Sequence, residues 1–121
     1  NKKISAANVF NYIPTFIATN STESLTNSSS AASVSTAVSL VDSSGGATGL
    51  SLAAGVTGQI KTIICTTAGN NITITPAATV GSGTTIVLDA AGESVTLMYT
   101  GSAWAAIATS SFASSISTVI Q

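Results

Sequence analysis

The chain has 121 residues, of which 6% are charged and 45% are hydrophobic, with no histidine and a formal net charge of −1. This length allows one core, so we expect one domain, or one domain with an arm. The charged fraction is far below the roughly 25% of an average soluble protein. Little repulsion separates neighbouring copies, which predicts a surface that other protein normally covers. The charged residues are Lys2, Lys3, Lys61, Glu23, Asp42, Asp89 and Glu93.

Residues 4–13 are predicted to form a short helix. Ser5 can cap its start, apolar residues recur at helical spacing, and Pro14 ends it because proline cannot continue the hydrogen-bond ladder. Large apolar and aromatic side chains gather at its end: Phe10, Tyr12, Ile13 and Phe16. They form either a small local cluster or an anchor that docks on a partner. We favour the partner anchor, because nothing nearby in the sequence would bury them.

The stretch that follows, TFIATNSTESLTNSSSAASVS, is dominated by Ser, Thr, Asn and Ala and has no periodicity. It predicts an extended arm or linker. The expected organisation is therefore an N-terminal helix and arm over residues 1–33 and a β-sandwich body over residues 34–121. The lysines near the start precede no continuous apolar run, which makes a poor signal peptide, and no run approaches the roughly 20 residues of a transmembrane helix.

From Val34 onward the hydrophobic pattern alternates with a period of two, which is typical of strands. Turn signals separate the segments, and short strands with turns every 8 to 12 residues indicate a sandwich or small barrel. The fold class is predicted to be mainly β, with an antiparallel β-sandwich or jelly-roll-like body. Strands are expected at residues 34–41, 48–53, 59–67, 71–75, 84–89, 93–100 and 103–109.

Two turns in this body can be predicted in detail. Residues 93–109 should form one hairpin around Thr100-Gly101-Ser102, with no charge after Glu93 on either face. Asp89-Ala-Ala-Gly92 suits a type I turn closed by a left-handed glycine, which would pair the strand from Glu93 with that of residues 86–88. Beyond them, Phe112, Ile116, Val119 and Ile120 return to helical spacing, so a C-terminal helix is favoured over a final strand.

Inward positions of the predicted strands give the expected core. They are Ile72, Ile74, Ile86, Leu88, Val95, Leu97, Tyr99 and Trp104. Cys65 lies in an apolar run and is expected to be a small buried hydrophobe. Trp104 is expected to fill space beside small residues, and if it lies near Tyr99 across the turn, the aromatic pair would add to the stability. The competing interpretation is an exposed platform on which a sugar stacks.

The sequence contains almost none of the residue types that carry out catalysis or bind metal ions. Without histidine, and with one cysteine, neither the commonest general base nor a zinc site is available. Asp89 and Glu93 are the one close pair of carboxylates; they could serve a glycosidase or calcium, but an aspartate is expected at such a turn. Three lysines and no arginine give no nucleic-acid footprint. We therefore predict no enzyme, no catalytic residue, no metal and no cofactor, and neither nucleic acid nor membrane as a partner.

Three marks stand out in residues 58–108: Gly58-Gln59 with Lys61 opening a strand, the segment Asn71-Ile-Thr-Ile-Thr-Pro76, and Ser94-Val-Thr-Leu followed by the Trp104 strand. With these marks, residues 58–108 resemble a β-rich module of small virion proteins of tailed bacteriophages. The opening KKISAANVFNYI is similar to a short helix that precedes such modules. The resemblance implies a trimeric virion component without catalytic residues.

The expected function is that of a capsid decoration or cement protein on the outer capsid surface. It would form a homotrimer and grip the major capsid protein, or another virion protein, through its arm. A module of a tail fibre or spike is the alternative. A secreted adhesin or surface-layer component is a third possibility, against which the poor signal peptide counts.

Overall fold

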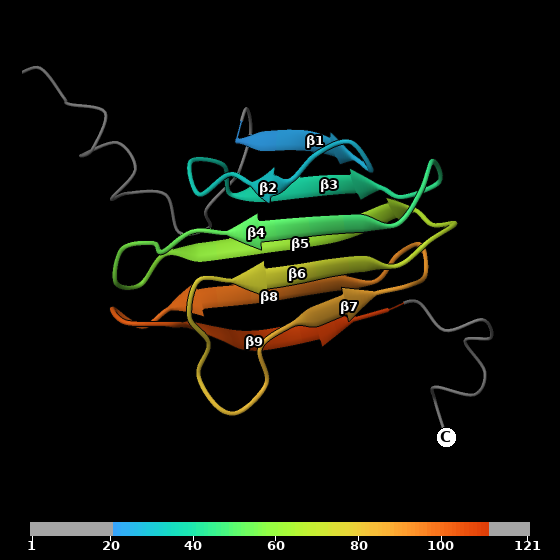
Figure 1. Ribbon diagram of the computed structural model, residues 1–121. Coiled ribbons are helices and arrows are strands. Elements are labelled where there is room, and N and C mark those ends of the chain that lie inside the picture. The colour runs from blue at the N-terminus through green and yellow to red at the C-terminus, as the bar shows by residue number, and fades with distance from the viewer. Residues whose placement is uncertain (1–20, 112–121) are drawn as a thin grey trace, which may run out of the picture.

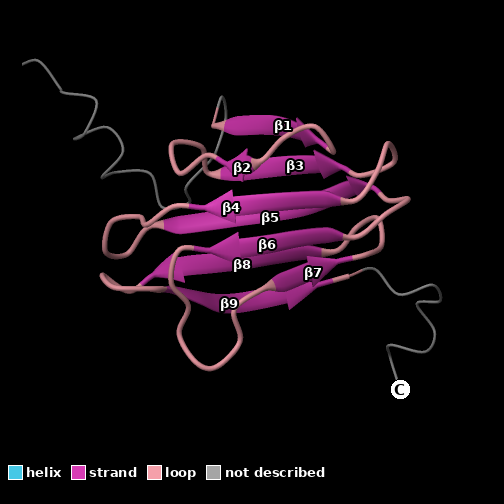
Figure 2. Ribbon diagram, viewed as in Figure 1, coloured by secondary structure: helices cyan, strands magenta, loops and turns pink. Residues whose placement is uncertain are grey.

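The computed structural model describes residues 21–111, which contain nine strands and no helix (Figures 1 and 2). The predicted helix at residues 4–13, the anchor residues Phe10, Tyr12, Ile13 and Phe16, and the predicted C-terminal helix lie outside the described residues. The strands are β1 (Thr22–Thr26), β2 (Ala31–Ala32), β3 (Val38–Asp42), β4 (Thr48–Leu52), β5 (Ile60–Thr67), β6 (Ile72–Pro76), β7 (Ile86–Leu88), β8 (Ser94–Tyr99) and β9 (Trp104–Ser110).

These strands form two sheets that face each other. The large sheet has the order β1-β3-β5-β8-β9, and the small sheet has the order β2-β4-β6-β7. From β1 to β6 the chain crosses to the opposite sheet after every strand, so it winds as a flattened coil (Figure 1). The chain then stays in one sheet for β6 and β7 and in the other for β8 and β9. The body is therefore a parallel coil closed by antiparallel strands.

The predicted antiparallel, jelly-roll-like arrangement is wrong for the coil. The pairs β1/β3, β3/β5, β2/β4 and β4/β6 are parallel, and only β5/β8, β6/β7 and β8/β9 are antiparallel. Parallel neighbours need a long crossover, which the coil supplies by sending the chain through the other sheet. Short strands separated by turns give the same sequence pattern in a coil as in a sandwich of hairpins, so the strands were predictable and their pairing was not.

The predicted arm is also wrong for residues 21–33. Both β1 and β2 belong to the sheets, and β1 pairs with β3 over its full length. Their polar composition gives no hydrophobic alternation from which strands could be predicted. Leu25 and Ala32 are the buried hydrophobic residues that they contribute. The body therefore starts near residue 21 rather than 34, and the strand expected at residues 34–41 starts at Val38.

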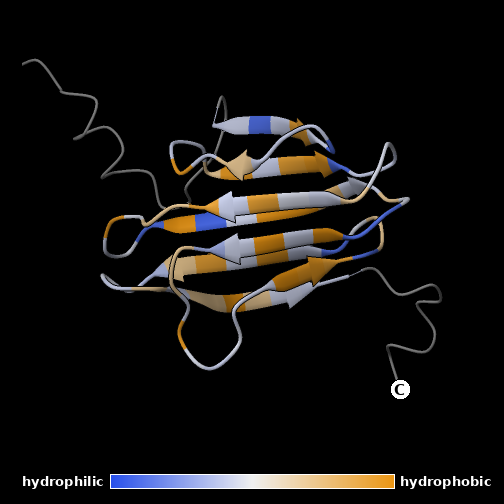
Figure 3. Cartoon of the chain, viewed as in Figure 1, coloured by the Kyte–Doolittle hydropathy of each residue, from blue (hydrophilic) through white to orange (hydrophobic). Residues whose placement is uncertain are grey.

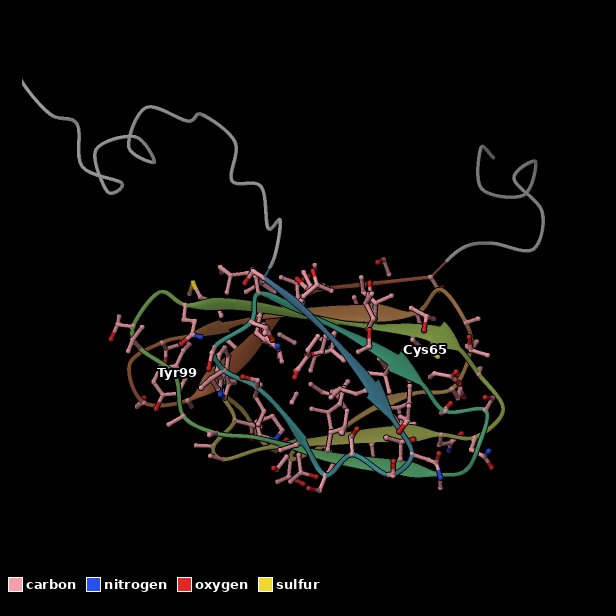
Figure 4. All side chains as sticks on the ribbon, turned by 90° about the horizontal axis from the view of Figure 1, so that it is seen from above. Cys65 and Tyr99 are labelled. Carbon is pink, nitrogen blue, oxygen red and sulfur yellow. The ribbon has the colours of Figure 1, made fainter. Side chains whose placement is uncertain are left out.

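The core lies between the sheets, and hydrophobic and polar residues alternate along the strands that enclose it (Figure 3). Seven of the predicted core residues are buried there, and Ile86 is half-buried against them. Cys65 is buried toward one end of this space and Tyr99 toward the other (Figure 4). The buried predicted residues are Ile72, Ile74, Leu88, Val95, Leu97, Tyr99 and Trp104.

Candidate partner interface

The carboxylate pair at the β7–β8 turn is occupied by the turn itself. The Glu93 carboxylate accepts the backbone N–H groups of Asp89 at 2.6 Å and Ala90 at 3.1 Å, and these hydrogen bonds lower the Glu93 pKa. Gly92 has a φ of 91°, as the predicted left-handed position requires. However, β7 and β8 lie in different sheets, so the hairpin expected between them does not exist. Within residues 21–111 no cluster of His, Cys, Asp and Glu could hold a metal ion.

A buried lysine is the feature that sequence reasoning missed. The Lys61 side chain is fully buried, and its Nζ donates to Thr36 Oγ1 at 2.8 Å and to the Thr36 carbonyl at 3.0 Å. The nearest oxygen of Glu23 lies 3.6 Å away and also accepts the Ser33 N–H at 2.7 Å and the Ser39 hydroxyl at 2.5 Å. The period of two in β5 was the available signal, because Lys61 shares the inward face of Ile63.

This network, made of Lys61, Glu23, Thr36, Ser33 and Ser39, ties β1 to β3 and β5. Burial lowers the Lys61 pKa, and the charge of Glu23 opposes that effect. Burial acts to raise the Glu23 pKa, but hydrogen bonds from Ser39 and Ser33 together with Lys61 lower it. All buried side-chain nitrogen and oxygen atoms of the described part have hydrogen-bond partners. The network therefore fixes the first coil, and its lysine is withdrawn from solvent.

Trp104 is buried rather than exposed, with 1% of its surface accessible. Its indole N–H donates to the Ala53 carbonyl at 2.8 Å. The Tyr99 ring meets it edge-on, with centroids 5.2 Å apart and an interplanar angle of 71°. The interpretation as an exposed sugar platform is therefore wrong, and the condition that Trp104 lies near Tyr99 is met.

The outer face of the large sheet has side chains that suit contact with another protein. Its central positions alternate with buried residues along β3, β5 and β8, so they point away from the core. The register aligns Val38 with Thr62 and Thr96, and it aligns Ile60 with Met98. None of these central residues is charged. They are Val38, Leu40, Ile60, Thr62, Ile64, Thr96 and Met98.

Hydroxyl groups on this outer face bond to one another. Thr62 Oγ1 lies 3.1 Å from Thr96 Oγ1, and Ser94 Oγ lies 2.8 Å from Ser110 Oγ across β8 and β9. A hydroxyl that already has a partner in the sheet loses less when water is removed. The outer face can therefore be covered by another protein surface at a small desolvation cost.

The outer face of the small sheet differs in kind. Its positions carry short side chains, including Gly49 and Ser51 on β4 and Thr73 and Thr75 on β6. Val87 on β7 is its large apolar side chain, with 51% of its surface exposed. The branched and sulfur-containing apolar side chains of the central strands thus gather on the large sheet.

In comparisons with known proteins, no family model matches the chain, and no curated protein is significantly similar to it. Within residues 21–111 there is no helix long and apolar enough to cross a membrane.

Proposed function

We propose that the chain is a non-enzymatic structural protein of a virion, most specifically a homotrimeric decoration protein that stabilises the capsid from its outer surface. The observation that carries the proposal is the uncharged centre of the outer face of the large sheet, where apolar side chains stand beside hydroxyls that bond to one another. A virion component keeps such a face covered by neighbouring copies. Protein interfaces likewise have few charges at their centre.

The role proposed for the N-terminal segment is attachment. Phe10, Tyr12, Ile13 and Phe16 would anchor the trimer to the major capsid protein or to another virion protein. The correction of the body's start to residue 21 shortens this segment but leaves all four residues in it.

A module of a tail fibre or spike is the second candidate, and the parallel coil favours it. Stacked coils can extend along an axis, because each coil needs contacts only with its neighbours. Within residues 21–111, β1 and β2 of the first coil each have a strand neighbour on one side only. Further coils could therefore be added at that end.

The number of copies per particle distinguishes the two candidates. Particles purified from the source of this sequence would be analysed by quantitative mass spectrometry, with the major capsid protein as internal standard. A decoration protein should be present at a large, fixed fraction of the capsid-protein copies. A few copies per particle would indicate the fibre or spike, and absence from the particles would contradict both virion proposals.

A further inference from the structure

The space between the two sheets is open along one side, between the edge strands β7 and β9. A hollow of about 630 Å³ lies there, lined by all three residues of β7 and by Thr109, Ser110 and Ser111. A second hollow of about 180 Å³ shares Ile86 with the first and reaches Leu97, Trp104 and Ala106. We call these two hollows the β7–β9 cleft, after the two edge strands, which lie at the lower edge of the molecule in Figure 1.

The cleft exists because the edge strand of the small sheet is shorter than the edge strand of the large sheet. Strand β7 has three residues, whereas β9 has seven. Ala106 and Thr109 pair with Leu97 and Val95, which are buried, so they share the inward side of the large sheet. Both are nevertheless exposed, because the two hollows separate them from β7. A further segment beside β7 would cover them.

The chain supplies such a segment directly after the cleft. Ser111 lines the first hollow and is the last described residue, and ten residues follow it. Their sequence, FASSISTVIQ, has no charge and contains Phe112 and Ile116 among small polar residues. Ten residues reach about 33 Å when extended, more than the roughly 23 Å length of a seven-residue strand such as β9.

The residues that line the β7–β9 cleft also argue against a charged ligand. Among the described residues, Glu93 is the one charged residue that lines either hollow, and its carboxylate already accepts two backbone N–H groups of the turn. The remaining described lining is mainly apolar or carries hydroxyl groups, and Ile86 lines both hollows. An uncharged segment that combines large apolar side chains with serines and threonines matches this lining.

We infer that residues 112–121 of the same chain occupy the β7–β9 cleft, where Phe112 and Ile116 cover Ile86 and complete the small sheet's side of the core. This contact is independent of the virion role. It makes the C-terminal residues part of the body and removes the open side through which the core meets water.

A disulfide cross-link in the full-length chain tests the contact. Ile86→Cys combined with Ile116→Cys should form a disulfide within one chain on mild oxidation, seen as a mass loss of two hydrogens and faster migration on a non-reducing gel, because Ile86 lines both hollows. The matched control is Val56→Cys with Ile116→Cys. Val56 is exposed and lies in the loop between β4 and β5, which is at the opposite end of the molecule from the end of β9 (Figure 1), and it should give no such bond. The native Cys65 is buried and does not compete.

Two results would overturn the inference. A disulfide between chains would mean that the segment of a second copy fills the cleft, and equal cross-linking of the two pairs would mean that the segment has no fixed site. If the cysteine variants fold poorly, Phe112→Ser in the full chain should increase the binding of a hydrophobic dye and lower the melting temperature. Phe10→Ser is the control, and equal effects of the two substitutions would also contradict the contact.

Discussion

Lys61 is the residue whose environment the sequence describes least well. An inward lysine in a hydrophobic strand is stable only if it is paired, and three strands converge to provide its partners. Burying an ion pair seldom adds stability in itself, but removing one partner of such a pair is costly. The network therefore serves to fix the position of β1, an edge strand that contributes little to the core.

We predict that Glu23→Gln destabilises the protein more than Lys61→Met does. The first change leaves a buried ammonium without its counter-charge, which costs about 3–5 kcal/mol in a fully buried pair. We expect a value toward the lower end, because 20% of the Glu23 side chain is exposed and Thr36 still accepts from Lys61. Urea denaturation of both single variants measures the difference. Adding Lys61→Met to Glu23→Gln should recover stability, and a further loss would contradict this account.

Stability should fall in acid, and Glu23 should contribute to the fall. Its pKa lies below the ordinary 4.5, and the pKa values of Asp42 and Glu93 are also lowered. In the unfolded chain these groups bind protons at a higher pH, so their contribution is complete above about pH 4.5 and is lost as the pH falls through the folded values. Urea midpoints between pH 6 and pH 2.5 test this. Glu23→Gln should flatten the profile, and an unchanged slope would exclude Glu23 as a contributor.

Trp104→Ala should destabilise strongly, because the indole fills the end of the core and its N–H satisfies the Ala53 carbonyl. The expected loss is about 3–5 kcal/mol of unfolding free energy. Ile107→Ala on the same strand is the control, since Ile107 is 54% exposed and its loss should be small. Thermal denaturation compares the two variants. Native tryptophan emission should be blue-shifted, and red emission would contradict the burial.

At the scale of elements, the first two strands decide where the body begins. Removing residues 1–20 should leave the sheets intact, whereas removing residues 1–33 also removes β1, β2 and the partner of Lys61. We predict that only the longer truncation loses cooperative unfolding. Circular dichroism melts of the two truncated proteins test this, and a cooperative melt after the longer truncation would show that β1 and β2 are dispensable.

Strands could be predicted from local pattern, and sheet membership could not. Alternation identified the inward residues of β6 and β8, because a period of two needs no knowledge of the partner strand. The turn at Gly92 was also predictable, because a glycine there allows a positive φ. Whether the chain after that turn folds back on β7 or crosses to the other sheet depends on the whole core. β1 was missed because its stability comes from Leu25 and from the distant Lys61.

Only part of the candidate interface could be predicted from the sequence. The sequence indicated that Thr96 and Met98 share an uncharged face of the last hairpin. It could not indicate that Val38, Leu40 and Ile64 extend that face, because the parallel pairing with β3 brings them there. The buried Lys61 was likewise invisible as a pair, since its partner Glu23 lies in a stretch without periodicity.

At the scale of the whole molecule, the proposed trimer depends on the outer face of the large sheet. The outer face of the large sheet is uncharged at its centre, and its hydroxyls are paired within the sheet. The outer face of the small sheet has shorter side chains and supplies an internal control. If the large-sheet face joins copies of the chain, a lysine placed there must be desolvated in the assembly, which is costly without a partner charge.

The most direct measurement is the mass of the protein in solution by light scattering. At micromolar concentration the unmodified chain should form a homotrimer, three times the 11.8 kDa chain mass. Thr96→Lys should shift it to monomer, whereas Thr73→Lys, an equally half-buried threonine on the small sheet, should leave the trimer intact. A folded, stable 11.8 kDa monomer for the unmodified chain would contradict the central claim, as would equal behaviour of the two lysine variants.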